Sequence, residues 1–381
     1  MFFHISQQPQ ENYPCQWQLG SFAVSTDEGW KQLAIGPVQM LYKGYADAGP
    51  LESLLGQIMF QSIPQLTGNF CALVVVNDTL TIQSDRYRGF PIYINDAGIN
   101  NLVATDRTAW TDSLVTVHAD LSVTENKFDV IGNIDTNHST VDDIDSLLSK
   151  KIQQYAQQVT EPIRVFLSGG VDTLLVYSYL RRCQIPHELI WAEHCEHDAF
   201  WLANHADICK NWGYRQIHHW QEPCVLASGA PGDEFMLRSP VTANQYLMHH
   251  GSSILQLLVE NSDCLHREYF KLQKHVKIFS DQMCNYQPAA TDQDFNWAMC
   301  NIVVNDWQHW HIGNTLTWTP LRDLELFKLC LRLPLELAKG QIMNSSVSRT
   351  LIEQNVPGLS SALSDQKNSG SYMKNLQQLL G

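Results

Sequence analysis

Unbroken apolar runs and helical spacing alternate near the middle of the chain. Residues 165–167 form one apolar run, residues 174–180 are apolar on nearly every face of a helix, and residues 188–192, apolar after Glu188, form a second run. A short run without alternation is typical of a strand in a parallel sheet that is covered on both faces. We therefore predict a strand, a buried helix and a second strand, which together form the right-handed crossover of an α/β domain. Ligands of such domains bind at the carboxyl ends of the strands.

The first third of the chain has a different pattern, in which β-prone runs alternate with turns. Residues 68–76 and 79–84 flank the pair Asn77-Asp78, which predicts a β-hairpin. The apolar spacing over residues 51–63 is helical. These elements favour an α+β β-sandwich over a second nucleotide-binding domain.

A polar, irregular stretch over residues 111–145 separates the two patterns. We place the domain boundary in this stretch, with one domain at 1–120 and another at 121–381. Thr140 is the predicted N-cap of the helix that leads into the second domain, because acidic residues follow it in the first turn. The predicted fold is α/β overall, with an N-terminal α+β sandwich and a C-terminal parallel-sheet domain.

Charge and cysteine content narrow the class of protein. The 381 residues include 25 basic and 39 acidic ones, for a net charge of −14. Nucleic-acid binding requires a basic face, so we expect no nucleic-acid partner. No apolar stretch approaches the roughly 20 residues of a membrane span, and the first residues lack the basic start of a signal peptide. Ten cysteines without a Cys-x-x-Cys pair indicate reduced thiols, so we expect a cytoplasmic protein with no membrane partner.

The loop between the first strand and the buried helix reads Ser168-Gly169-Gly170-Val171-Asp172-Thr173. It has little side-chain bulk, so its backbone amides can approach an anion at the helix N-terminus. The Asp172 carboxylate beside them can hold a Mg²⁺ that the anion also binds. The string resembles the pyrophosphate loop of the ATP-pyrophosphatase superfamily. It is neither a Walker A loop nor a Gly-x-Gly-x-x-Gly dinucleotide loop.

This resemblance implies that ATP binds at the loop and is split into AMP and pyrophosphate, so that the chemistry is adenylation. It implies a cofactor-binding set of Leu167, Ser168, Gly169, Gly170, Asp172 and Thr173. It also implies that the backbone near Trp191 borders the adenine.

A second segment, from Ser228-Gly229 to Asp233-Glu234, follows another predicted strand. It resembles the corresponding segment of the asparagine synthetase and β-lactam synthetase family. The resemblance implies that Ser228 and Gly229 contact the adenosine, and that Asp233 joins Asp172 in binding Mg²⁺. Ala230 replaces an acidic residue that is common in the glutamine-using members.

Two further segments resemble the same family near the C-terminus. Lys367 lies in a segment that matches the family's lysine-bearing loop, and the resemblance implies that it stabilises charge as pyrophosphate leaves. Lys339 is a second candidate for this role. Trp318 stands where the family has an arginine, so we predict a different acceptor pocket.

The N-terminal domain resembles the glutaminase-type domain of asparagine synthetases. The matching residues are Asp85, Pro91 and Tyr93, together with the hairpin that begins at Gly68. Enzymes of this type use an N-terminal cysteine thiolate as nucleophile, whereas residue 2 of this chain is Phe2. We therefore predict a degenerate glutaminase-like domain that releases no ammonia from glutamine.

These features predict an ATP- and Mg²⁺-dependent, AMP-forming amide ligase that joins the carboxylate of a small molecule or peptide to an amine. The amine is ammonia, an external amine, or an amine of the substrate itself, as in cyclases of the β-lactam or lasso-peptide type. An RNA-modifying ATP-pyrophosphatase and a non-catalytic ATP-binding protein stay open as competing hypotheses, and so does a homodimer. Residues 193–197 contain histidine, cysteine and glutamate, but their spacing does not complete a zinc site.

Overall fold

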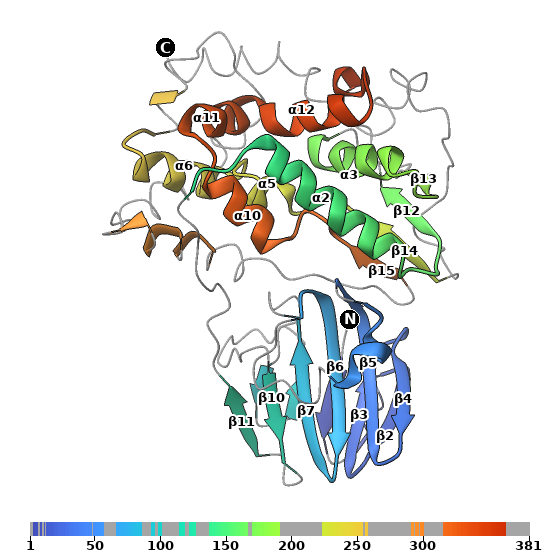
Figure 1. The fold of residues 1–381 in the computed structure, drawn as a ribbon. Coiled ribbons are helices and arrows are strands. Elements are labelled where there is room, and N and C mark those ends of the chain that lie inside the picture. Colours follow the sequence, from blue (N-terminus) through green and yellow to red (C-terminus); the bar gives the residue numbers. More distant parts are fainter. Residues whose placement is uncertain are drawn as a thin grey trace.

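The computed structural model shows two bodies, an all-β one at the bottom of Figure 1 and an α/β one above it. The structure describes residues 3–6, 8, 9, 11, 13–47, 49–56, 66–85, 93–95, 98–100, 114–118, 122–126, 137–166, 170–190, 223–253, 256, 257, 291, 292, 294–296, 298–300 and 315–362. Among the helices in these ranges, none is long and apolar enough to cross a membrane.

The N-terminal body is a sandwich of two antiparallel sheets. The first sheet has the order β2 (Cys15–Leu19), β3 (Phe22–Thr26), β1 (Phe3–Ser6), β9 (Gly98–Asn100) and β8 (Tyr93–Asn95). The second has the order β11 (Val123–Asn126), β10 (Leu114–Val117), β7 (Thr79–Ser84), β6 (Gly68–Val76), β5 (Val38–Ala46) and β4 (Lys31–Ile35). The two sheets confirm the antiparallel β-structure predicted for this part, whereas the helical part of the α+β prediction is described only at residues 51–56.

Strand β6 is buried on both faces, which explains its unbroken apolar sequence. Leu73 and Val75 face the first sheet, whereas Ala72 and Val74 belong to a separate cluster that includes the 3₁₀ helix η1 (Leu51–Leu54). The predicted hairpin is confirmed, because β6 pairs with β7 in antiparallel register across the turn. Both turn residues have left-handed backbone angles, with φ of 48° and 58°, as in the tight turns that match the twist of paired strands.

Strands β10 and β11 lie in the stretch that the sequence predicts to be irregular. Strand β10 pairs with β7 on one side and with β11 on the other, so the second sheet continues past residue 120. Each of these strands has only four residues, and a short threonine-containing run gives little periodic signal.

The C-terminal body contains a sheet of four parallel strands. Their order is β13 (Glu188–Ile190), β12 (Ile163–Phe166), β14 (Cys224–Ala227) and β15 (Thr315–Trp318), and every neighbouring pair is parallel. Helix α3 (Val171–Arg182) joins β12 to β13, and nine of its residues are buried, eight of them consecutive from Thr173 to Leu180. The predicted strand, buried helix and parallel strand are therefore confirmed. The run Tyr214-Arg215-Gln216-Ile217-His218 predicts a third strand, and it lies outside the described residues.

Helices pack beside this sheet and on one another (Figure 1). They are α2 (Val141–Ala156), α5 (Gly232–Phe235), α6 (Pro240–His249), α10 (Leu324–Leu331), α11 (Leu335–Asn344) and α12 (Ser346–Asn355), followed by the 3₁₀ helix η3 (Leu359–Ala362). Helix α2 begins at Thr140 as predicted, with a capping box in which Thr140 and Asp143 bond each other's backbone amides. Asp145 of α2 accepts hydrogen bonds from Tyr179 and Arg182, which fixes α3 against α2.

Three aromatic rings join the two bodies. Tyr45 of β5 meets Tyr155 of α2 edge to face at 4.7 Å, and Tyr155 stacks on Trp318 of β15 at 4.1 Å. All three side chains are taken out of water by this contact, which favours the observed docking of the sandwich on the parallel sheet. Trp318 is therefore an interface residue that packs under α2.

Candidate functional site

The loops that follow β12 and β14 meet at the same edge of the parallel sheet. Val165 and Ala227 are Cα partners near the ends of the two strands, so the chain leaves both strands at the same level. Gly170 is the N-cap of α3, and Asp172 is in the first turn of that helix. This is the edge at which open α/β sheets bind their ligands.

Two glycines allow the loop after β14 to touch the start of α3. A Cβ atom on Gly229 would lie 2.4 Å from the Asp172 carbonyl carbon and from the Thr173 nitrogen. A Cβ on Gly232 would lie 2.4 Å from the Asp172 Cγ. Both distances are far below van der Waals contact, so the backbones can approach this closely only without side chains. Gly229 and Gly232 therefore have a steric role.

The same loop is fixed on its other side by β15. Ser228 donates its backbone N–H to the Trp318 carbonyl at 2.8 Å, and the Ser228 hydroxyl accepts a hydrogen bond from the Ala230 N–H at 3.2 Å. Both glycines of the loop are thus held against α3 by bonds from the neighbouring strand and by an internal turn.

Asp172 and Asp233 converge on one guanidinium. Arg238 Nη1 lies 2.5 Å from Asp172 Oδ1, and Arg238 Nη2 lies 2.9 Å from Asp233 Oδ1. The Arg238 side chain is only 4% exposed, whereas those of Asp172 and Asp233 are 18% and 25% exposed. The Asp172 contact is a charge-assisted hydrogen bond and the Asp233 contact is an ion pair, so one planar fork links both carboxylates. The two aspartates were predicted from the sequence, and the arginine was missed.

An unusual backbone angle aims Arg238 at the aspartates. The preceding residue, Leu237, is fully buried and has a φ of 57°. The Asp233 carbonyl then accepts hydrogen bonds from the Arg238 and Ser239 amides at 2.7 Å and 2.6 Å. A left-handed leucine costs about 1–3 kcal/mol, and such strain is kept where surrounding packing enforces it. The turn sends the arginine back over α5.

The donor set of this site suits Mg²⁺. Two carboxylates that already share one cation lie close enough together to share another, and Mg²⁺ is commonly held by one or two carboxylates together with substrate phosphates and water. Within the described ranges, no group of three or more His, Cys, Asp or Glu side chains could enclose a metal ion.

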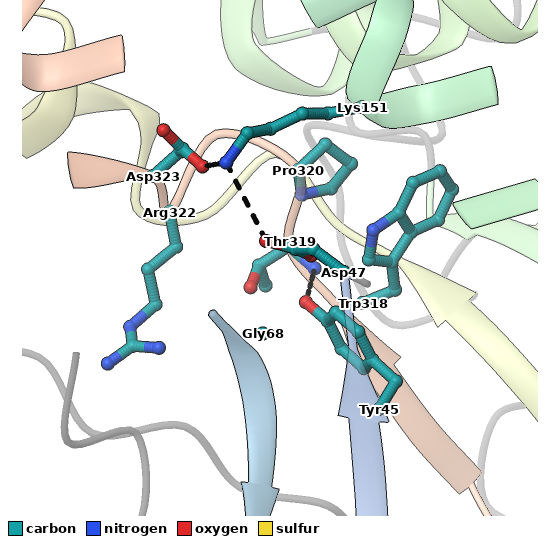
Figure 2. A pocket seen from close by; sticks show the side chains of 9 residues that line it. All are labelled: Tyr45, Asp47, Gly68, Lys151, Trp318, Thr319, Pro320, Arg322 and Asp323. Atoms are coloured by element: carbon teal, nitrogen blue, oxygen red, sulfur yellow. Dashed lines mark hydrogen bonds and ion pairs between the residues drawn. The ribbon is translucent and has the colours of Figure 1, made fainter. Parts of the chain in front are cut away.

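A polar pocket lies between the sandwich and the parallel-sheet body (Figure 2). Lys151 of α2 forms ion pairs with Asp323 and, at 3.6 Å, with Asp47. The Tyr45 hydroxyl accepts a hydrogen bond from the Thr319 N–H at 3.5 Å. Burial and the nearby Asp47 raise the pKa of Tyr45, so the phenol is neutral.

Beside this pocket, Asp85 and Arg322 form an ion pair at 3.6 Å between two fully buried side chains. Asp85 follows β7 in the sandwich, and Arg322 follows β15. The segment after β7 and the segment after β15, which are far apart in the sequence, are therefore in contact. Removing one partner of such a pair leaves a buried charge, which is strongly destabilising.

The remaining predicted site residues divide into two groups. Lys339 is on α11 and pairs with Glu336 at 3.1 Å, and Thr173 is buried at the start of α3. The residues outside the described ranges are Phe2, Leu167, Ser168, Gly169, Trp191 and Lys367, together with the segment 193–197.

Neither a scan against protein-family models nor a search of curated proteins gives a match for this chain.

Proposed function

We propose that this chain is an ATP-dependent, AMP-forming amide ligase that adenylates a substrate carboxylate and transfers the acyl group to an amine. The observation that carries the proposal is the meeting of Asp172 and Asp233 at the N-terminus of α3, on the carboxyl edge of a parallel sheet. The resemblance of residues 168–173 to the ATP-pyrophosphatase loop supports the same chemistry from the sequence alone.

The chain has a group that could stabilise each charge that develops in such a reaction. The N-terminus of α3 carries a partial positive charge that favours the pyrophosphate of ATP, and Ser168, Gly169, Gly170 and Thr173 belong to the loop that would hold it. A Mg²⁺ ion held by Asp172 and Asp233 would neutralise phosphate charge when bound. Lys367 is our candidate for offsetting charge on the departing pyrophosphate.

The N-terminal sandwich supplies no evident glutaminase nucleophile among its described cysteines. Cys71 is fully buried in β6, and burial, followed by the charge of Asp85, raises the pKa of its thiol, which keeps it protonated. Cys15 lies within strand β2, so it has no free α-amine that could serve as its base. These positions support ammonia, an added amine or an amine of the substrate as the acceptor.

The test is ATP–pyrophosphate exchange with a panel of carboxylates, aspartate included, in the presence of Mg²⁺. We expect exchange with at least one acid, and a loss of roughly 100-fold or more in Asp172→Asn and Asp233→Asn. Asp78→Asn is the matched control, because Asp78 is in the exposed β6–β7 turn, where asparagine is equally compatible with the backbone. No exchange with any acid, together with an unchanged melting temperature in Mg-ATP, would contradict the proposal.

The amine source is identified by the product. Incubation with the active acid is repeated without amine, with ammonia and with a primary amine, and the product is analysed by mass spectrometry. Loss of water from the acid in the absence of added amine identifies an intramolecular cyclase. Amide formation with glutamine alone as donor would show that the sandwich is an active glutaminase despite Phe2.

A further inference from the structure

The position of Arg238 between Asp172 and Asp233 is the feature that the proposed reaction does not require. A site that only has to hold Mg²⁺ and ATP needs the two carboxylates, yet here both form ion pairs with a buried guanidinium. Resting on the proposed function, we infer that Arg238 is a positioning residue that holds the metal-binding carboxylates together until Mg²⁺ and nucleotide arrive, and so makes metal binding depend on the nucleotide.

The geometry shows why Arg238 and a metal compete. Each aspartate presents its Oδ1 atom to a different nitrogen of the same fork, at 2.5 Å and 2.9 Å. A cation that bridges the two carboxylates needs oxygens from the same two groups. The positive charge of the guanidinium offsets part of the negative charge of the two carboxylates, so the metal-free site attracts a divalent cation more weakly than the carboxylates alone would.

The burial of Arg238 explains why the nucleotide is needed. The side chain is 4% exposed, and a guanidinium separated from its carboxylates without another anion would leave a buried, uncompensated charge. The phosphates of ATP offer planar pairs of oxygens that suit the guanidinium fork. Nucleotide can therefore accept Arg238 while the carboxylates turn to the metal, whereas metal alone cannot.

The backbone supports a role for this particular side chain. The left-handed Leu237 and the two amides bonded to the Asp233 carbonyl direct Arg238 toward the site. Gly232 allows α5 to approach the Asp172 carboxylate to within contact, which brings the two acids within reach of one fork. The arrangement is preorganised before any ligand binds.

The experiment measures Mn²⁺ binding by electron paramagnetic resonance, with Mn²⁺ as a probe for Mg²⁺, in the presence and absence of α,β-methylene-ATP. In the unaltered protein we expect weak Mn²⁺ binding that tightens when the nucleotide analogue is added. Arg238→Met should bind Mn²⁺ without nucleotide about tenfold more tightly or better, because the competing cation is gone. The effect of the analogue on Mn²⁺ affinity should shrink correspondingly.

Three variants serve as controls. Arg181→Met removes the same charge from the opposite, exposed end of α3 and should leave Mn²⁺ binding unchanged. Arg238→Lys keeps the charge but not the fork, so we expect intermediate behaviour, and it keeps the test valid if Arg238→Met does not fold. Asp172→Asn combined with Arg238→Met should abolish the gain in Mn²⁺ affinity.

The outcomes separate this inference from the proposed function. Equal Mn²⁺ affinity in the unaltered protein, Arg238→Met and Arg238→Lys, with the same response to the analogue, would overturn the role of Arg238 even if exchange activity is present. A gain in nucleotide-free Mn²⁺ binding in Arg238→Met, without any exchange activity in the unaltered protein, would support the role of Arg238 and count against the ligase.

Discussion

Gly229→Ala tests the contact on which the candidate site depends. The added Cβ would lie 2.4 Å from two backbone atoms of α3, and ordinary van der Waals contact begins at 3.4 Å. The difference, 3.4 − 2.4 = 1.0 Å, is the distance by which the loop must withdraw from the helix. Neither neighbour can yield by changing a rotamer, because both atoms belong to the backbone.

This displacement has two consequences of calculable size. Overpacking of a close contact costs about 1–3 kcal/mol, which urea unfolding measures directly. A misplacement of about 1 Å between groups that act together lowers the rate about 100-fold, and ATP–pyrophosphate exchange measures this loss. The stability loss is expected whether or not the chain is a ligase.

Gly56→Ala is the control for Gly229→Ala. Gly56 is exposed after η1, and no atom of the described residues lies within 4 Å of a Cβ built there. We expect unchanged exchange and a stability that is equal or up to about 1 kcal/mol higher. If Gly229→Ala behaved like Gly56→Ala in both measurements, the close approach of the β14–α5 loop to α3 would be refuted.

Three further predictions concern stability and reactivity. Tyr155→Phe should unfold at an equal or slightly higher temperature, because the buried hydroxyl has no hydrogen-bond partner among the described residues; a loss above about 2 kcal/mol would contradict this. Thr140→Ala should lose about 1 kcal/mol in urea at pH 7, and less at pH 3. Hydrogen bonds from Thr140 lower the pKa of Asp143 below its usual 3.8. The stability that these bonds contribute is therefore present above pH 3.8 and is lost as the pH falls through the pKa of Asp143 in the folded protein. An equal loss of stability at pH 7 and at pH 3 would contradict this reasoning. Burial raises the pKa of Cys330 to about 12 and that of Cys71 as well, so neither thiol should react with a disulfide reagent in the native protein at pH 8, whereas rapid reaction of either would show that its surroundings open.

The elements that could be predicted from the sequence are those whose own residues determine them. The hairpin over 68–84 follows from two β-prone runs and a turn that tolerates left-handed angles. The α3 region follows from an apolar helix between two apolar strands. The short strands β10 and β11 could not be predicted, because they exist through pairing with β7. The helix expected over 51–63 starts as 3₁₀ structure at 51–54, and residues 57–65 lie outside the described ranges.

The candidate site shows the same division between local and tertiary information. Gly229, Asp172 and Asp233 were predictable from the sequence. Gly229 makes a close approach to α3, and the two aspartates carry the charge of the site. Arg238 was not, because its direction depends on the left-handed Leu237 and on hydrogen bonds to the Asp233 carbonyl. The Trp318 ring stacks on Tyr155 between the two bodies, and its effect on an acceptor pocket stays a prediction.

The interface gives the N-terminal sandwich a part in the site that does not depend on glutamine hydrolysis. The Tyr45 hydroxyl bonds the Thr319 amide, and the neighbouring Trp318 carbonyl accepts the bond from Ser228 that holds the glycine loop against α3. Sandwich, β15, loop and α3 thus form one continuous series of contacts. A series of this kind fixes the loop whatever the sandwich itself does. Asp85 of the sandwich and Arg322 of the other body form a buried ion pair, so each body compensates a charge that the other buries. The sandwich therefore contributes, through β15, to holding the β14–α5 loop in place.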